Sequence, residues 1–136
     1  MNDIIEGKID VILRNLEFLN EYKYIDEEEF LNSYKDVQAV KYSLLEIVEA
    51  CIDIASHIIS AKGFERAESY AEMFEILCKR GVINRELAEK LSDMARFRNI
   101  LVHGYAKVDN AKVLEIVKEE LEDVEEFVKE ILKVKL

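Results

Sequence analysis

Cationic, amide, imidazole and phenol side chains gather in one short stretch of the chain, residues 96–105. Arg98 carries a planar guanidinium, which matches the geometry of a phosphate. His103 carries an imidazole, the side chain that exchanges protons near neutral pH. These two groups suffice for metal-independent cleavage of RNA, in which the neighbouring 2′-OH attacks the phosphorus. Arg98 and His103 are therefore the candidate catalytic pair.

A helix through this stretch would hold the two side chains apart. At 100° per residue, Arg98 and His103 diverge by about 140°, whereas Asn99 and His103 share a face. One chain can hardly wrap both catalytic side chains around one small group, but two copies related by a two-fold axis could pool them in a shared cleft. The spacing predicts a homodimer, with Asn99 as a supporting residue.

The same residues also have simpler interpretations. Arg98 could be a solvated cation on a helix, and His103 could be a helix-end residue. Tyr105 follows Gly104, a predicted helix stop, and could be a half-buried aromatic. His57 lies one helical turn after Asp53, and a core histidine bonded to a backbone carbonyl is the favoured interpretation for it.

Charge argues against non-specific binding to nucleic acid, because the formal net charge is −10. Five of the arginines nevertheless lie in the middle of the chain, and the acidic excess lies mainly at its two ends. These five could form a locally positive cleft, or they could be scattered over solvated helix faces. They are Arg66, Arg80, Arg85, Arg96 and Arg98.

Other classes of site have little support. No His, Cys, Asp and Glu cluster has metal-ligand spacing, and no glycine-rich phosphate loop is present, so we expect no metal and no cofactor. Cys51 and Cys78 are expected to be buried free thiols. The apolar stretches fall short of the roughly 20 residues that a membrane span needs, and the N-terminus does not resemble a signal peptide. We therefore expect a cytoplasmic protein with no membrane or DNA partner.

The absence of proline and the helical spacing of apolar residues predict an all-α protein, a compact antiparallel bundle of about five helices. Residues 1–136 would form a single domain. The expected helices cover residues 2–22, 30–61, 69–80 and 84–103, with a final helix that begins near Asp109. In the helix over residues 69–80, the side chains predicted to point inward are Tyr70, Phe74 and Leu77.

The stretch from Arg98 to Tyr105 resembles the Arg-x4-His-x-Tyr signature of HepT proteins, a branch of the HEPN superfamily. Three further segments resemble the middle portion of that family in order and spacing, so the resemblance covers nearly the whole chain. They are residues 53–59, 69–74 and 81–83.

The resemblance implies the HEPN fold, shared with substrate-binding subunits of nucleotidyltransferases, and the toxin of a two-gene toxin–antitoxin system that acts on RNA. It places Arg98 and His103 in the ribonuclease site. It also implies a partner, the minimal nucleotidyltransferase antitoxin MntA, which would adenylylate Tyr105. Asp53 matches a polar residue that often faces the Arg-His motif and would support it. The alternative for Asp53 is a carboxylate satisfied by a neighbouring Lys or Arg.

Two hypotheses remain, one for an enzyme and one for a non-catalytic binding module. The first is a homodimeric, metal-independent endoribonuclease toxin. The second is a non-catalytic helical module, a substrate-binding or regulatory subunit of a minimal nucleotidyltransferase. The intact pair of Arg98 and His103 favours the enzyme, and the negative net charge favours the module.

Overall fold

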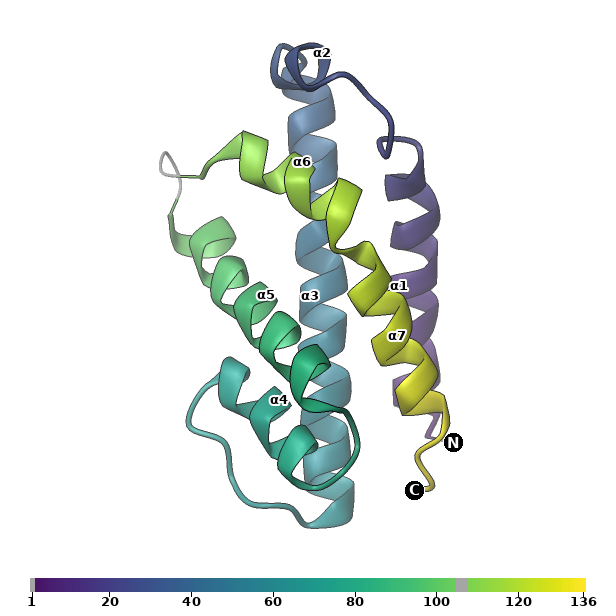
Figure 1. Ribbon diagram of the computed structural model, residues 1–136. Coiled ribbons are helices and arrows are strands. Elements are labelled where there is room, and N and C mark those ends of the chain that lie inside the picture. The colour runs from purple at the N-terminus through teal and green to yellow at the C-terminus, as the bar shows by residue number, and fades with distance from the viewer. Residues whose placement is uncertain (1, 105–107) are drawn as a thin grey trace.

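The computed structural model describes residues 2–104 and 108–136, and the regular elements in these ranges are all α-helices (Figure 1). The predicted all-α class is therefore confirmed. The helices are α1 (Asp3–Asn20), α2 (Glu27–Leu31), α3 (Tyr34–Lys62), α4 (Tyr70–Lys79), α5 (Arg85–His103), α6 (Asn110–Glu119) and α7 (Leu121–Leu132).

The described ranges hold seven helices rather than about five, because two of the predicted helices are interrupted. The second predicted helix breaks before Ser33, whose hydroxyl oxygen accepts a hydrogen bond from the Asp36 N–H at 3.2 Å and so begins α3. Side chains of this type compete with the helical backbone for hydrogen bonds. The final predicted helix breaks at Glu120, which separates α6 from α7.

Helix α3 runs through the centre of the bundle (Figure 1). Helix α1 lies antiparallel to it on one side, α4 and α5 pack on the other, and α7 returns toward α1. Hydrogen bonds between side chains help to join α1 and the residues after it to α3. The Ser43 hydroxyl donates to Asn15 Oδ1 at 2.7 Å, and the Tyr22 hydroxyl donates to Asp36 Oδ1 at 2.9 Å. Burial, and then the bond to Asp36, raises the pKa of Tyr22 to about 12.

The predicted apolar stripes form one core cluster in which the helices meet. The inward position predicted for Phe74 and Leu77 is confirmed, since both are buried. The inward position predicted for Tyr70 is wrong. Tyr70 is the first residue of α4 and is 39% exposed, because its ring packs against Arg98 of α5 instead of the core.

Two local signals in the sequence set the end of α3 and the start of α5. Gly63 ends α3 with φ of 65°, a left-handed conformation that favours glycine. The Asn84 side chain caps α5 by accepting from the Leu87 N–H at 2.8 Å. These signals fix where α5 begins and how the chain enters it.

The two cysteines are free thiols but differ in burial. Cys51 is buried, as predicted, and burial raises the pKa of its thiol to about 12, so the thiol stays protonated. Cys78 is only partly buried, which corrects the prediction for that residue. None of the helices described here is both long enough and apolar enough to cross a membrane.

Candidate active site

Helix α5 carries the candidate catalytic residues, and its first three turns are anchored in the core. The Ser92 hydroxyl donates to the Ala71 carbonyl oxygen at 3.1 Å and so ties α5 to α4. The face of α5 that meets the other helices is apolar. Its buried residues are Leu87, Ala88, Leu91, Met94 and Ala95. The packing of the first three turns therefore fixes the position of the last turns of α5, which carry Arg98 and His103.

Arg98 is held by contacts with three other side chains. Its Nε–H donates to Oε1 of Glu49, on α3, at 2.8 Å, and its Nη1 donates to Oδ1 of Asn99 at 3.2 Å. Its guanidinium carbon lies 5.2 Å from the centroid of the Tyr70 ring. The Arg98 side chain is only 16% exposed, although it lies at the edge of the bundle. These contacts fix the direction of the guanidinium.

The guanidinium of Arg98 still has donors to offer. A guanidinium has five N–H groups, and the bonds to Glu49 and Asn99 use one on Nε and one on Nη1. The other Nη1 hydrogen and both Nη2 hydrogens form no hydrogen bond to a described residue. Arg98 can therefore be oriented by Glu49 and bind an oxyanion at the same time.

His103 is the last residue of α5, and its side chain is exposed. The helix is unbroken from Arg98 to His103, so the two side chains diverge as the spacing requires. The Gly104 N–H donates to the Ile100 carbonyl oxygen at 2.7 Å. A Cβ at Gly104 would lie 2.5 Å from that same oxygen, so glycine allows the chain to close tightly against the helix end.

The remaining predicted site residues are not all brought to Arg98. Asn99 contacts it and is exposed. Asp53 instead forms an ion pair with Lys8 of α1 at 2.9 Å, the alternative in which a neighbouring cation satisfies the carboxylate. His57 is half-buried and forms no hydrogen bond within the described ranges, so the predicted bond to a backbone carbonyl is absent there. Tyr105 lies outside the described residues.

Two contact residues of Arg98 were missed by sequence reasoning. Glu49 lies one helical turn before Asp53 on the same face of α3, but Glu49 pairs with Arg98 of α5 and Asp53 pairs with Lys8 of α1. Tyr70 had been assigned to the core. A carboxylate one turn from Asp53 was a visible signal for Glu49, but two carboxylates four residues apart share a helix face, so spacing alone could not say which of them meets Arg98.

Comparison with known proteins decides the family. The family model described as "Ribonuclease HepT-like" matches residues 12–131. The mRNA nuclease HepT of Shewanella oneidensis is 34% identical over 128 residues, which cover 94% of this chain and 96% of that protein. This chain belongs to the HepT-like family.

A second relative and a solved structure extend the similarity. The tRNA nuclease HepT of Aphanizomenon flos-aquae is 29% identical over 128 residues, which cover 94% of this chain and 87% of that protein. The solved structure of the tri-AMPylated HEPN toxin of Shewanella oneidensis in complex with MNT antitoxin superposes with a TM-score of 0.90. It is 33% identical and covers 98% of this chain and 100% of that chain. The helical arrangement is therefore that of HepT-like proteins along almost its whole length.

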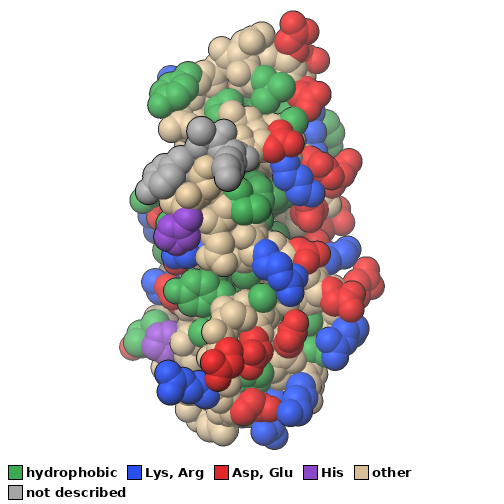
Figure 2. All heavy atoms as spheres, turned by 90° about the vertical axis from the view of Figure 1, so that its left-hand side faces the viewer, with side chains coloured by type: hydrophobic (Ala, Val, Ile, Leu, Met, Phe, Trp, Pro, Cys, Tyr) green, Lys and Arg blue, Asp and Glu red, His purple; other side chains and the backbone are tan. Residues whose placement is uncertain are grey.

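The surface over α4 and α5 of this HepT-like chain is not uniformly basic. Figure 2 shows basic and acidic side chains interspersed on the face that carries these two helices. Arg80 pairs with Glu65 at 2.9 Å, and Arg96 pairs with Asp93 at 2.8 Å. With Arg98 bound to Glu49, three of the five central arginines are neutralised by carboxylates within this chain. The described residues of a single copy therefore do not form the positive cleft that the arginine positions allowed.

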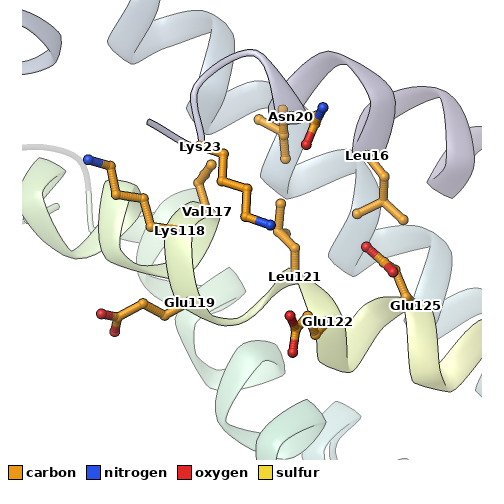
Figure 3. A pocket seen from close by; sticks show the side chains of 10 residues that line it. Leu16, Asn20, Lys23, Val117, Lys118, Glu119, Leu121, Glu122 and Glu125 are labelled. Carbon is orange, nitrogen blue, oxygen red and sulfur yellow. The ribbon is translucent and has the colours of Figure 1, made fainter. Parts of the chain in front are cut away.

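A hollow lies away from α5 (Figure 3). Side chains from α1, α6 and α7 surround it, with Lys23 and Glu122 at its edge. No residue of the Arg98 to His103 stretch lines it. This hollow therefore contains none of the candidate catalytic residues.

Proposed function

We propose that this chain is the toxin of a HepT/MntA toxin–antitoxin system and that it cleaves RNA as a metal-independent endoribonuclease. The observation that carries the proposal is the exposed end of α5, where an oriented Arg98 and an exposed His103 lie on one continuous helix. Membership of the HepT-like family supports it, as do relatives described as nucleases of mRNA and of tRNA.

Arg98 binds the phosphate in the proposed reaction. Its free N–H groups contact non-bridging oxygens and stabilise the charge that develops on them in the transition state. Glu49 acts through Arg98 and is a positioning residue, because its bond to Nε at 2.8 Å sets the direction of the guanidinium. Asn99, bonded to Arg98 at 3.2 Å, supports the same direction.

His103 transfers protons. An imidazole takes the proton of the 2′-OH, the 2′-oxygen forms a bond to phosphorus, and the bond from phosphorus to the 5′-oxygen breaks. The leaving 5′-oxygen takes a proton from an imidazolium. The products are a 2′,3′-cyclic phosphate and a 5′-hydroxyl, and water is not consumed in this step. No nucleophile from the protein is required.

A homodimer completes this site. Arg98 and His103 diverge around α5, and a two-fold axis near the end of α5 would bring two copies of each to one cleft, where one His103 could act as base and the other as acid. Ile100 lies between them in the sequence and is 46% exposed, so an apolar side chain is available for contact with a second copy.

The antitoxin partner would act on Tyr105, two residues after His103. Adenylylation there adds a negatively charged phosphate and an adenine beside the site, which repels RNA and fills the cleft. A solved relative described as a tri-AMPylated toxin in complex with MNT antitoxin supports both the partner and the modification.

The products of the reaction test the proposed function. The protein is incubated with a 5′-labelled single-stranded RNA, and the new ends are identified by mass spectrometry. We expect 2′,3′-cyclic phosphate and 5′-hydroxyl ends, and no cleavage at a position that carries a single 2′-deoxy substitution. Ends with a 5′-phosphate, or cleavage at the 2′-deoxy position, would contradict attack by the 2′-OH.

A second candidate function is the non-catalytic subunit of a nucleotidyltransferase. The net charge of −10 and the interspersed charges around α5 favour it. Such a subunit would bind the nucleotidyltransferase with wild-type affinity after Arg98 and His103 are both replaced, and it would cleave no RNA. Cleavage that depends on both residues would exclude it.

A further inference from the structure

An open hollow adjoins Arg98 between the start of α4 and the outer face of α5. Its lining combines an aromatic ring, an amide, a hydroxyl, a carboxylate and a thioether. These residues are Ala67, Glu68, Ser69, Tyr70, Met73 and Asn99. Two of them, Tyr70 and Asn99, contact the guanidinium of Arg98, so the hollow begins where the phosphate would be held.

Tyr70 offers a surface on which a flat group can stack. The Arg98 guanidinium carbon lies 5.2 Å from its ring centroid, and the residue is nevertheless 39% exposed. The contact with Arg98 therefore holds the ring beside the phosphate site and leaves part of it open. An aromatic ring next to a phosphate-binding cation is the arrangement by which proteins bind unpaired bases of single-stranded RNA.

Asn99 and Ser69, which both line the hollow, keep hydrogen-bond donors that no described residue uses. A guanidinium only donates, so the Asn99 oxygen must be the atom that faces Arg98, and the amide hydrogens are left over. The Ser69 hydroxyl oxygen accepts from the Glu72 N–H at 3.1 Å, and its own proton is not used by any described residue. Glu68 adds an exposed acceptor, and Met73 adds an apolar wall.

We infer that this hollow is a nucleobase subsite, in which a base next to the phosphate on Arg98 stacks on Tyr70 and accepts hydrogen bonds from Asn99 and Ser69. The inference rests on the proposed function, because it names a feature of the RNA substrate. Asn99 and Ser69 supply two donors and Glu68 an acceptor, and uracil presents two carbonyl oxygens on either side of a ring N–H along one edge. The corresponding edge of adenine presents one ring-nitrogen acceptor beside an amino group, so one of the two donors would stay unpaired. The subsite therefore prefers uracil to adenine.

RNA binding in the His103→Ala background tests the subsite without requiring cleavage. Fluorescence anisotropy gives the affinity for labelled hexauridylate, for hexaadenylate and for an abasic ribose–phosphate oligomer of the same length. We expect hexauridylate to bind more tightly than both. Adding Tyr70→Ala should weaken hexauridylate binding roughly ten-fold, the effect of losing one stacked base, and should leave the abasic oligomer unchanged. Tyr70→Phe should retain the affinity.

Two further variants complete the test. Asn99→Ala should reduce the preference for hexauridylate over hexaadenylate, because it removes the amide donors. Tyr42→Ala is the matched control, since Tyr42 is also an exposed tyrosine but lies on α3 and does not line the hollow. Equal affinity for all three oligomers, or a Tyr70→Ala effect no larger than that of Tyr42→Ala, would overturn the inference. Failure of the wild type to cleave RNA would instead refute the proposed function.

Discussion

Arg98 on α5 and Glu49 on α3 form an ion pair of 2.8 Å between residues 49 positions apart in the chain. The pair joins the helix that carries the candidate catalytic residues to the central helix of the bundle. The Glu49 side chain is 39% exposed and that of Arg98 only 16%, so the pair lies at the rim of the bundle. The bond to Glu49 fixes the direction of the Arg98 guanidinium.

Replacing Glu49 tests this positioning role. We expect Glu49→Ala to lower kcat/KM for RNA about ten-fold, which corresponds to about 1.4 kcal/mol of lost transition-state stabilisation. Glu49→Gln should retain most of the activity, because its amide oxygen can still accept the Arg98 Nε–H. Initial rates over a range of RNA concentrations separate kcat from KM.

Glu46→Ala is the matched control for Glu49→Ala, because Glu46 lies one turn earlier on α3 and forms no ion pair with a described residue. It should cleave RNA at the wild-type rate. A Glu49→Ala protein as active as this control would show that Arg98 needs no partner on α3.

Mixing two inactive variants tests the shared site of the proposed homodimer. Arg98→Ala and His103→Ala proteins are unfolded together and refolded, so that about half of the dimers contain one copy of each. These mixed dimers have one intact Arg98 and one intact His103 in the common cleft. We expect part of the cleavage activity to return, as measured on labelled RNA.

The refolded single variants serve as controls for the mixing experiment and should remain inactive. Light scattering on the wild type should give the mass of two chains. A monomer at micromolar concentration would contradict a site shared between two copies, whereas a mixed dimer without activity would show that cleavage needs both copies of Arg98 or of His103.

Modification of Tyr105 tests control by the antitoxin. Incubation with the cognate nucleotidyltransferase and ATP should add adenylate mass to the peptide that contains Tyr105 and should lower RNA cleavage in proportion. Tyr105→Phe should stay unmodified and active. Adenylate on another residue, with Tyr105 untouched, would contradict the assignment.

Glu65 predicts a pH dependence of stability. Hydrogen bonds from Lys79, the Glu65 backbone and Arg80 lower the pKa of this carboxyl to about 2, below its ordinary value of 4.5. A lowered pKa in the folded state stabilises the protein above the ordinary value, and this contribution is lost as the pH falls toward 2. The difference in unfolding free energy between wild type and Glu65→Gln should be constant above about pH 5.5 and shrink steadily below it.

Urea unfolding between pH 3 and pH 7 measures this difference at each pH. Glu68→Gln is the control, because Glu68 lies in the same segment and forms no ion pair with a described residue. Added salt should reduce the contribution of Glu65, since the group is near the surface. A difference that does not change with pH would show that the ion pairs of Glu65 do not persist in solution.

Local signals predicted most of the fold. Capping residues such as Asn84 and helix stops such as Gly63 act within a few residues, so the sequence reveals them directly. The break at Glu120 was missed because the apolar stripe continues in phase across it. Val117 and Val124 are seven residues apart, two helical turns, and both are buried.

The residues of the candidate site were likewise predictable only where the signal lies within one helix. Arg98 and His103 were found because their spacing along one helix is visible in the chain. Glu49 and Tyr70 contact Arg98 from α3 and α4, and only the packing of those helices on α5 brings them there. Periodicity assigns a residue to a face of its own helix but does not say which residue of another helix it will meet.

The most direct test of the account is the rate of RNA cleavage in EDTA by the wild type, Arg98→Ala and His103→Ala, with folding verified by circular dichroism. We expect EDTA to leave the wild-type rate unchanged, because Arg98 and the 2′-OH replace a metal ion and a protein nucleophile. Each variant should lose at least about 100-fold in rate while remaining helical. Equal cleavage by all three proteins, or a wild-type rate abolished by EDTA, would contradict it.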